Sequence, residues 1–158
     1  MITNRSTFGM CALKEKIYAV GGFQAPRYLN SVEGYDPRAN HWYTCATLDQ
    51  GPRRDLGLAA LDDIGCLFAI GGYDGQTCLT RVETYDPRED KWRAAAPLPE
   101  ARQLLSACAA HGWVYAMGGF DGRKTCGDVF AYDVRIDKWM PHQPMTTVRL
   151  GLGAVAAQ

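Results

Sequence analysis

A threefold internal repeat constrains the fold of this chain more than any other feature of its sequence. Two adjacent glycines occur three times, and a tyrosine follows fourteen residues after the first glycine of each pair. A tryptophan follows seven residues after each tyrosine, and neither spacing changes between copies. The repeated positions are Gly21, Gly22, Tyr35 and Trp42, then Gly71, Gly72, Tyr85 and Trp92, then Gly118, Gly119, Tyr132 and Trp139. Self-similarity of this kind indicates one supersecondary unit used three times.

Each unit is predicted to be a four-stranded antiparallel sheet. In the second unit, apolar or alternating runs cover residues 56–61, 66–70, 81–85 and 91–95. They are bounded by Asp-Asp, Gly-Gly, Asp-Gly and Asp-Pro sequences, which are typical of turns. Runs of this length are too short for helices of three turns. We therefore expect an all-β chain in which each unit is a meander.

The repeated residues have distinct structural roles in this prediction. The double glycine ends the second strand, where it permits positive φ and a close approach of neighbouring backbone. The aspartate after each tyrosine is expected to cap the amides of a tight turn, in which proline fixes φ. Tyrosine and tryptophan flank one hairpin, and such large side chains need cover that an isolated sheet lacks. We expect them to pack against the next sheet.

This order of features resembles the kelch repeat over nearly the whole chain. The segments Val32–Pro37 and Val82–Pro87 read Val-Glu-x-Tyr-Asp-Pro and are most similar to kelch domains of BTB-kelch adaptors of cullin-type ubiquitin ligases. The third copy, Val129–Val134, departs from this pattern because it has neither the glutamate nor the proline. The resemblance implies a kelch β-propeller that binds other proteins.

The repeats divide the chain into three blades and part of a fourth. They cover approximately residues 5–48, 53–98 and 102–145. An arginine opens each later unit, at Arg53, Arg102 and Arg149, and its recurrence favours a structural role. Residues 149–157 resemble residues 5–13, so they are expected to form the first strand of a fourth blade. Residues 1–158 are thus predicted to form a partial propeller.

Three blades are too few to close a ring, since propellers have about four to eight. We expect the chain to be a piece of a longer adaptor. The alternative is a half-propeller that dimerises into a six-bladed ring. In such a dimer, residues 5–13 of one copy and residues 149–157 of the other would compete for the same strand position at each junction. This redundancy favours a piece of a longer adaptor.

Charge and composition reduce the classes of partner and cofactor that this chain is expected to bind. Lysine plus arginine and aspartate plus glutamate number 17 each, which disfavours nucleic acid and anionic membranes. No apolar run approaches the roughly 20 residues of a membrane helix, so a soluble, cytoplasmic protein is expected. Cys11 and Cys108 fall where the second unit has Ala59, which indicates reduced thiols used as small apolar residues. The spacing of cysteine and histidine predicts no metal site, and we expect no cofactor.

The predicted binding surface consists of the loops between the second and third strands, together with the loops entering each first strand. The candidates are residues of these loops that suit protein contacts, and most of them differ between repeats. They are Arg27, Tyr28, Arg54, Asp55, Tyr73, Gln76, Gln103, Arg123 and Lys124. Phe23, Tyr73 and Phe120 follow the glycines in one register, so an alternative role for them is to fill the base of each loop. Trp113 has no counterpart in the other repeats, and an edge or interface role is one interpretation.

We expect this chain to recognise a protein or peptide, such as a degradation substrate of a cullin-type adaptor, and to have no catalytic residues. Alternatives on the same fold are a copper oxidase, a sugar-processing enzyme or a cytoskeletal, actin-binding scaffold, since fold does not fix function. A copper oxidase needs histidine and tyrosine ligands gathered at the axis. The three histidines are instead scattered, and His41 and His142 fall at hairpin positions.

Overall fold

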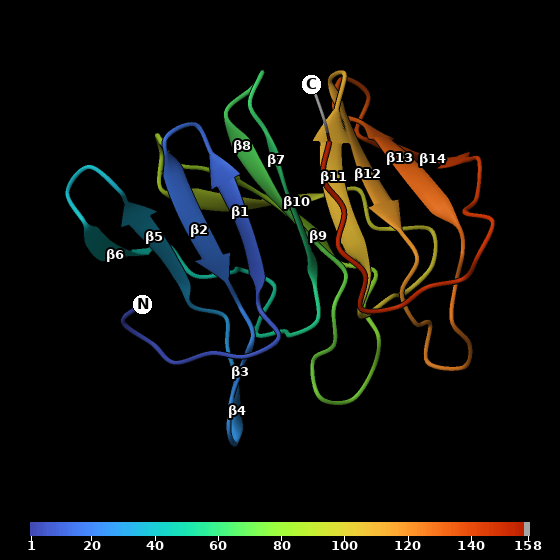
Figure 1. Ribbon diagram of the computed structural model, residues 1–158, viewed down its shortest axis with the longest axis horizontal. Helices are drawn as coiled ribbons and strands as arrows, with labels where there is room; N and C mark the ends of the chain where they lie inside the picture. Colours follow the sequence, from blue (N-terminus) through green and yellow to red (C-terminus); the bar gives the residue numbers. More distant parts are fainter. Residues whose placement is uncertain (157–158) are drawn as a thin grey trace.

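The computed structural model describes residues 1–156 and contains three four-stranded antiparallel sheets and one small hairpin (Figure 1). Blade 1 comprises β1 (Gly9–Leu13), β2 (Lys16–Val20), β5 (Val32–Asp36) and β6 (His41–Cys45). Blade 2 comprises β7 (Gly57–Leu61), β8 (Cys66–Ile70), β9 (Val82–Asp86) and β10 (Lys91–Ala95). Blade 3 comprises β11 (Ser106–Ala110), β12 (Trp113–Met117), β13 (Val129–Asp133) and β14 (Lys138–His142). The hairpin pairs β3 (Phe23–Gln24) with β4 (Arg27–Tyr28). The predicted all-β fold of kelch blades is confirmed.

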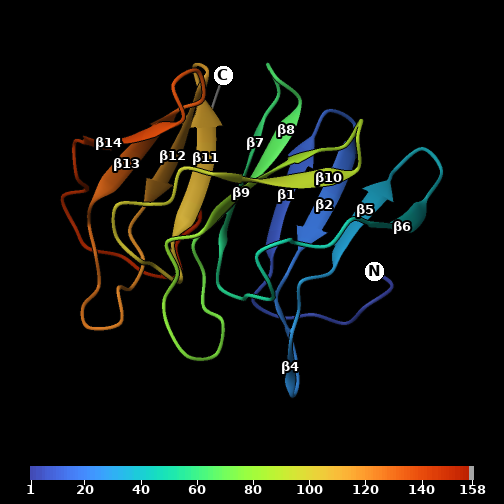
Figure 2. The same cartoon turned by 180° about the vertical axis from the view of Figure 1, so that it is seen from behind.

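The blades stand side by side as an arc of a propeller (Figures 1 and 2). Their first strands, β1, β7 and β11, lie together at the inner edge, and the fourth strands β6 and β14 lie outside. The loops between second and third strands all extend toward one end of the molecule, at the bottom of Figure 1. This end, called the loop face below, also receives the connections that enter each first strand.

The double glycines have positive φ and lie close to neighbouring backbone, which here belongs to the segment entering the next blade. Gly71 has φ of +60° and Gly72 has φ of +108°. The Gly72 N–H donates to the carbonyl of Arg102, which opens the next blade, at 2.7 Å. A Cβ on Gly71 would lie 2.6 Å from that same carbonyl oxygen, so any side chain there collides with backbone.

The tyrosine and tryptophan of blades 2 and 3 are core residues, but they pack in the direction opposite to the one expected. Trp92 is 1% exposed and stacks on Tyr85 with ring centroids 5.0 Å apart. Both rings join a core cluster with Leu13 and Tyr18 of the preceding blade, not the following one. Trp139 and Tyr132 likewise pack against blade 2.

In blade 1 the same two residues are only half buried. Tyr35 and Trp42 stack on each other at 5.0 Å, as their counterparts do. Neither ring belongs to a core cluster of residues 1–156. The neighbouring Tyr43 packs against the cluster shared with blade 2, so strand alternation puts Trp42 on the opposite face of the sheet. Tyr35 and Trp42 are therefore less buried than the core role predicted for them requires.

The recurring arginines form buried ion pairs. Arg53 donates to Glu83 at 2.5 Å and to the carbonyl of Arg81 at 3.2 Å, and both charged side chains are fully buried. Arg5 pairs with Glu33 in the same way at 2.6 Å. A structural role is confirmed for Arg53 and Arg102 by their burial and by their bonds to backbone carbonyls, and Arg5 has the same role. The third arginine of the prediction, Arg149, differs because its side chain is exposed.

Blade 3 replaces this glutamate with Phe130, and its arginine pairs differently. The guanidinium of Arg102 lies over the Phe130 ring, 5.0 Å from its centroid. Its charge is met by Glu100 at 2.7 Å and by Asp128 at 3.0 Å. The departure of the third repeat from the kelch pattern thus has a direct structural counterpart.

Residues 149–156 follow the path of an opening strand without forming one. The Arg149 N–H donates to Cys126 O at 3.1 Å and its carbonyl accepts from Gly119, as in the other repeats. The chain then continues without strand structure to residue 156, and residue 157 of the expected strand lies outside the described residues. A first strand pairs with the second strand of its own blade, and the described chain supplies none for this one.

The remaining predictions concern turns and thiols. Asp36, Asp86 and Asp133 each accept a hydrogen bond from the amide two residues later, at 2.9–3.0 Å, which confirms the predicted caps. All six cysteines are free thiols. Within residues 1–156, no helix is long and apolar enough to cross a membrane.

Candidate protein-interaction site

Two loops of the loop face have the same internal architecture. In blade 2 the Asp74 carboxylate accepts hydrogen bonds from the amides of Gln76, at 3.0 Å, and Thr77, at 2.9 Å. In blade 3 Asp121 accepts from Arg123 and Lys124 at 2.7 and 2.8 Å. These amide bonds, foremost that from Thr77, lower the pKa of Asp74. Each carboxylate therefore fixes the turn that carries the candidate contact residues.

The loops entering each first strand are hydrogen-bonded to these turns. Arg54 and Tyr73 exchange backbone hydrogen bonds at 2.8 and 3.0 Å, and Gln103 exchanges the same pair with Phe120. The residue after each recurring arginine therefore lies beside the loop aromatic of its own blade. In each of these blades, the loop entering the first strand and the loop between the second and third strands thus form one continuous surface.

Arg54 is held among aromatic rings. Its guanidinium carbon lies 5.4 Å from the ring centre of Phe23 and 5.5 Å from those of Tyr28 and Tyr73. Asp55 approaches the Arg54 Nε at 3.3 Å. The Arg54 side chain is still 32% exposed, so part of the guanidinium faces solvent in a fixed position.

The size of one loop residue decides whether neighbouring loops leave a gap. Five residues after the loop aromatic, blade 1 has Tyr28 and blade 2 has Cys78. Tyr28 lies over Gly75 of the next loop, where an added Cβ would be 2.9 Å from the tyrosine ring. Cys78 faces Gly122 in the equivalent way but is much smaller. The space that tyrosine fills between blades 1 and 2 is thus open between blades 2 and 3.

That opening is a groove with a volume of about 570 Å³. It is lined by Arg54, Tyr73, Gln76, Thr77, Cys78, Ala101, Gln103, Phe120, Asp121, Gly122 and Arg123. The volume falls within the range of ligand sites in proteins. Two arginines and two side-chain amides provide hydrogen-bond donors, and two aromatic rings provide apolar surface.

Five of the nine candidate residues meet at this groove, namely Arg54, Tyr73, Gln76, Gln103 and Arg123. Tyr28 adjoins them through Tyr73, with ring centroids 6.2 Å apart.

The other three candidates lie elsewhere. Arg27 and Lys124 are exposed but do not line the groove. Asp55 has a side chain only 8% exposed, behind Arg54.

Sequence reasoning missed Thr77, Cys78, Ala101 and Gly122 as lining residues. Cys78 could have been found by aligning the loops on their aromatic residues, because this alignment puts it opposite Tyr28. Its significance needs the additional fact that the two loops are neighbours in space. The sequence signal that was available is the difference in size between Tyr28 and Cys78 at equivalent loop positions.

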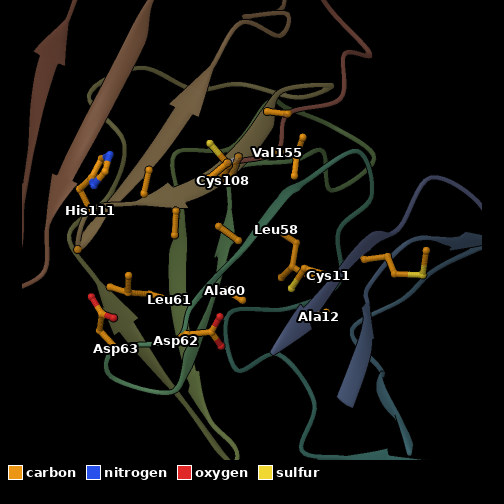
Figure 3. A pocket seen from close by; sticks show the side chains of 18 residues that line it. Cys11, Ala12, Leu58, Ala60, Leu61, Asp62, Asp63, Cys108, His111 and Val155 are labelled. Atoms are coloured by element: carbon orange, nitrogen blue, oxygen red, sulfur yellow. The ribbon is translucent and has the colours of Figure 1, made fainter. Parts of the chain in front are cut away.

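A second cavity of about 580 Å³ lies along the inner edge, between the first strands of the three blades (Figure 3). Cys11 and Cys108 lie on its wall and are half buried, beside small residues such as Ala60. Burial raises the pKa of the Cys11 thiol to about 12, with a smaller contribution from Asp62. Among residues 1–156 no three histidine, cysteine, aspartate or glutamate side chains gather as metal ligands would.

Comparison with known proteins agrees with this architecture. Residues 1–154 match the model of the KLHDC2/KLHL20/DRC7 Kelch-repeats domain. Human Kelch-like protein 4 is 45% identical over 38 residues, which are 24% of this chain and 5% of that protein. Mouse Kelch-like protein 35 is 49% identical over 41 residues, 26% of this chain and 7% of that protein. The aligned segments thus span a small part of either relative. With three kelch blades and a family match over nearly its whole length, the chain belongs to the kelch-repeat family.

Proposed function

We propose that this chain is a protein-binding module that holds a peptide segment of its partner in the groove between the loops of blades 2 and 3. The observation that carries this function is the convergence of five candidate loop residues, four of which differ between repeats, on one opening. Kelch-repeat domains are generally protein-interaction modules, which supports the same function. Variable loops on a repeated scaffold are also where such folds usually place specificity.

The groove residues favour a segment that carries a carboxylate. Among the lining side chains, Arg54 and Arg123 carry two positive charges and Asp121 carries one negative charge. Asp55 lies behind Arg54 at 3.3 Å and meets part of its charge, whereas Arg123 has no salt bridge among the described residues. Asp121 already accepts two backbone amides, so it opposes an acidic ligand less than a free carboxylate would. Arg54 is oriented by aromatic rings before any ligand arrives, which reduces the entropy lost on binding. Gln76 and Gln103 can bond the backbone of an extended peptide.

We further propose that the bound protein is a substrate selected for a cullin-type ubiquitin ligase. The short matches to Kelch-like proteins support this assignment. In such an arrangement the groove selects the substrate in the cytoplasm, while ligase recruitment belongs to another part of the assembly. The role of this chain is therefore recognition without catalysis.

The test of peptide binding compares two double variants with the same change in charge. Arg54→Ala with Arg123→Ala removes both groove arginines, whereas Arg27→Ala with Lys124→Ala removes two exposed cations outside the groove. Each variant is used for affinity capture from lysate, and captured peptides are mapped by limited proteolysis and mass spectrometry. We expect the first variant to lose the partners that wild type and the second variant retain. Equal retention by both variants would place binding elsewhere.

The ligase role has a separate readout. Partners that depend on the groove should have longer cellular half-lives when this chain is depleted. Unchanged half-lives, with groove-dependent capture intact, would refute substrate selection and leave peptide binding standing.

A further inference from the structure

We propose that a pocket between blades 1 and 2 binds an aryl phosphate, the chemical group that a phosphorylated tyrosine side chain also presents. The pocket has a volume of about 390 Å³, which falls within the range of ligand sites in proteins. It lies at the end of the blades opposite the loop face, beside the turns that join first strands to second strands, at the top of Figure 1. It is therefore separate from the groove of the proposed function. All of its lining residues belong to blades 1 and 2, which are both complete sheets.

The floor of the pocket is apolar and held in place. Leu13 and Tyr18 line it, and each is 3% exposed as a member of the core cluster shared by the two blades. The Tyr18 ring packs edge-to-face against Tyr85, with ring centroids 6.0 Å apart. Pro87 adds a half-buried ring to the wall. A flat apolar group bound here loses little binding energy to ordering of the protein, because these side chains are already fixed.

Two lysines supply positive charge that no salt bridge neutralises. Lys14 and Lys16 line the pocket, and neither forms a salt bridge among residues 1–156. The pKa of Asp36 is lowered mainly by the amide hydrogen bond from Ala39, and the charge of Lys16 makes a smaller contribution. That attraction acts beyond salt-bridge distance, where water and salt weaken it.

The other two charged side chains of the pocket are already paired. Glu15 accepts a hydrogen bond from Arg38 at 2.6 Å. Arg88 donates to both oxygens of the Asp86 carboxylate, from Nε at 2.9 Å and from Nη2 at 2.6 Å. Each pair joins one positive and one negative charge. The charges of the two lysines therefore remain in excess at this pocket.

The contacts of both lysines keep their ammonium groups beside the pocket. Lys14 lies in a turn with φ of +54°, and its backbone N–H donates to Asp62 at 3.1 Å. Its side chain passes over Gly65, where an added Cβ would be 3.2 Å from the Lys14 Nζ. The Lys16 Nζ lies 5.1 Å from the ring centre of Tyr43, a cation–π contact.

The equivalent crevice between blades 2 and 3 lacks these charges. Alignment on the glycine pairs puts Ile64 and Cys66 of blade 2 where blade 1 has Lys14 and Lys16. Ile64 and Cys66 line a smaller crevice of about 260 Å³. The basic pocket thus arises from side chains particular to blade 1, on a scaffold that both junctions share.

The excess charge and the apolar floor together select the ligand. A phosphate monoester carries about −1.5 to −2 charges at pH 7, which the two ammonium groups match. Lysine binds phosphate as a point charge, so it needs no planar fork of donors. A carboxylate has a single charge and would leave one ammonium group without a partner. A ring attached to the phosphate covers Leu13 and Tyr18 and removes their exposed apolar surface from water.

Isothermal titration calorimetry on the intact chain at low ionic strength compares three probes, namely phenyl phosphate, inorganic phosphate and benzoate. Inorganic phosphate lacks the ring, and benzoate lacks the second charge. We expect phenyl phosphate to bind about tenfold more tightly than either of the other probes. Equal affinity for inorganic phosphate or for benzoate would overturn the inference, as would no binding of phenyl phosphate at about 10 mM.

A double substitution tests whether the two lysines make the site. Lys14→Met with Lys16→Met removes both charges from exposed positions and keeps unbranched side chains. We expect affinity for phenyl phosphate to fall about a hundredfold, taking about tenfold for each charge-assisted contact. The matched control, Lys91→Met with Lys138→Met, removes two exposed lysines outside the pocket and should bind like wild type. Circular dichroism melting curves check that both variants are folded, and equal affinities of the two variants would overturn the inference.

The arginines of the groove also attract anions, so Arg54→Ala with Arg123→Ala is titrated as well. We expect this variant to bind phenyl phosphate like wild type, whether or not the groove binds a peptide. Loss of phenyl phosphate binding in this variant would place the anion in the groove and overturn the inference.

A short peptide that contains one phosphotyrosine distinguishes the two sources of the aryl phosphate. Binding comparable to that of phenyl phosphate assigns the pocket to a phosphorylated protein, and binding of phenyl phosphate alone assigns it to a small molecule. Either result supports the inference when Lys14→Met with Lys16→Met abolishes it, and binding that survives this double substitution contradicts it.

Discussion

Replacing Trp92 with alanine should destabilise the chain strongly, because this side chain joins two blades. Trp92 is 1% exposed within the core cluster of blades 1 and 2, and its indole N–H donates to the carbonyl of Ala46. Truncation leaves a cavity and a carbonyl without its donor. Together these effects reduce the free energy of unfolding by about 4–5 kcal/mol. For a chain of this length the melting temperature should fall by about 8–20 °C.

Trp42→Ala is the matched control for this prediction. It removes the same side chain from the equivalent position of blade 1, where the ring is half buried and its N–H has no acceptor among residues 1–156. Thermal unfolding of both variants is followed by circular dichroism at the same protein concentration. We expect Trp42→Ala to lose well under half as much stability as Trp92→Ala. Equal losses, or a shift of only a degree or two for Trp92→Ala, would refute the inter-blade origin of the stability.

Three other substitutions or treatments test single features. Gly71→Val should abolish soluble expression, because φ is +60° and the new Cβ would lie 2.6 Å from the Arg102 carbonyl; normal yield would contradict this. Glu83→Leu leaves the fully buried Arg53 without its counter-charge and should lower the free energy of unfolding, measured in urea, by about 3–5 kcal/mol. A decrease under about 1 kcal/mol would show that Glu83 is not needed to neutralise Arg53. The pKa of Cys11, raised to about 12 mainly by burial, keeps this thiol protonated at pH 8. Iodoacetamide should therefore label Cys11 much more slowly in native than in urea-unfolded protein, as measured by peptide mass spectrometry, and equal rates would contradict a protonated, shielded thiol.

The repeat predicted the fold well because its signals are local. Glycine pairs, aspartate caps and short alternating runs each act within a few residues, and the observed strands of the second unit begin and end within one residue of the predicted runs. The strand expected over residues 149–157 did not form across the described part, because a strand depends on a hydrogen-bonded neighbour as well as on its own sequence. The direction in which Tyr85 and Trp92 pack also depends on neighbours, and the sequence pattern does not specify it.

The candidate site was predictable only in part for the same reason. Variation between repeats identified Arg54, Gln76 and Arg123, and the structure places them around one groove. The groove itself arises because Cys78 is much smaller than Tyr28 at the equivalent position. This difference in size predicts a groove only once the structure shows that these side chains face the next loop. That these residues contact a partner stays a prediction.

Blade 3 has Phe130 where the other blades have glutamate, and this difference affects the order in which the blades unfold locally. In blades 1 and 2 the arginine meets a buried carboxylate, shielded from dissolved ions. In blade 3 the carboxylates of Glu100 and Asp128 are 58% and 53% exposed, so added salt screens their attraction for Arg102. Amide protons of blade 3 should exchange with deuterium before those of blade 2, and the difference should widen with ionic strength. Resistance to local opening should thus be lowest in blade 3, whose buried arginine has the most exposed counter-charges.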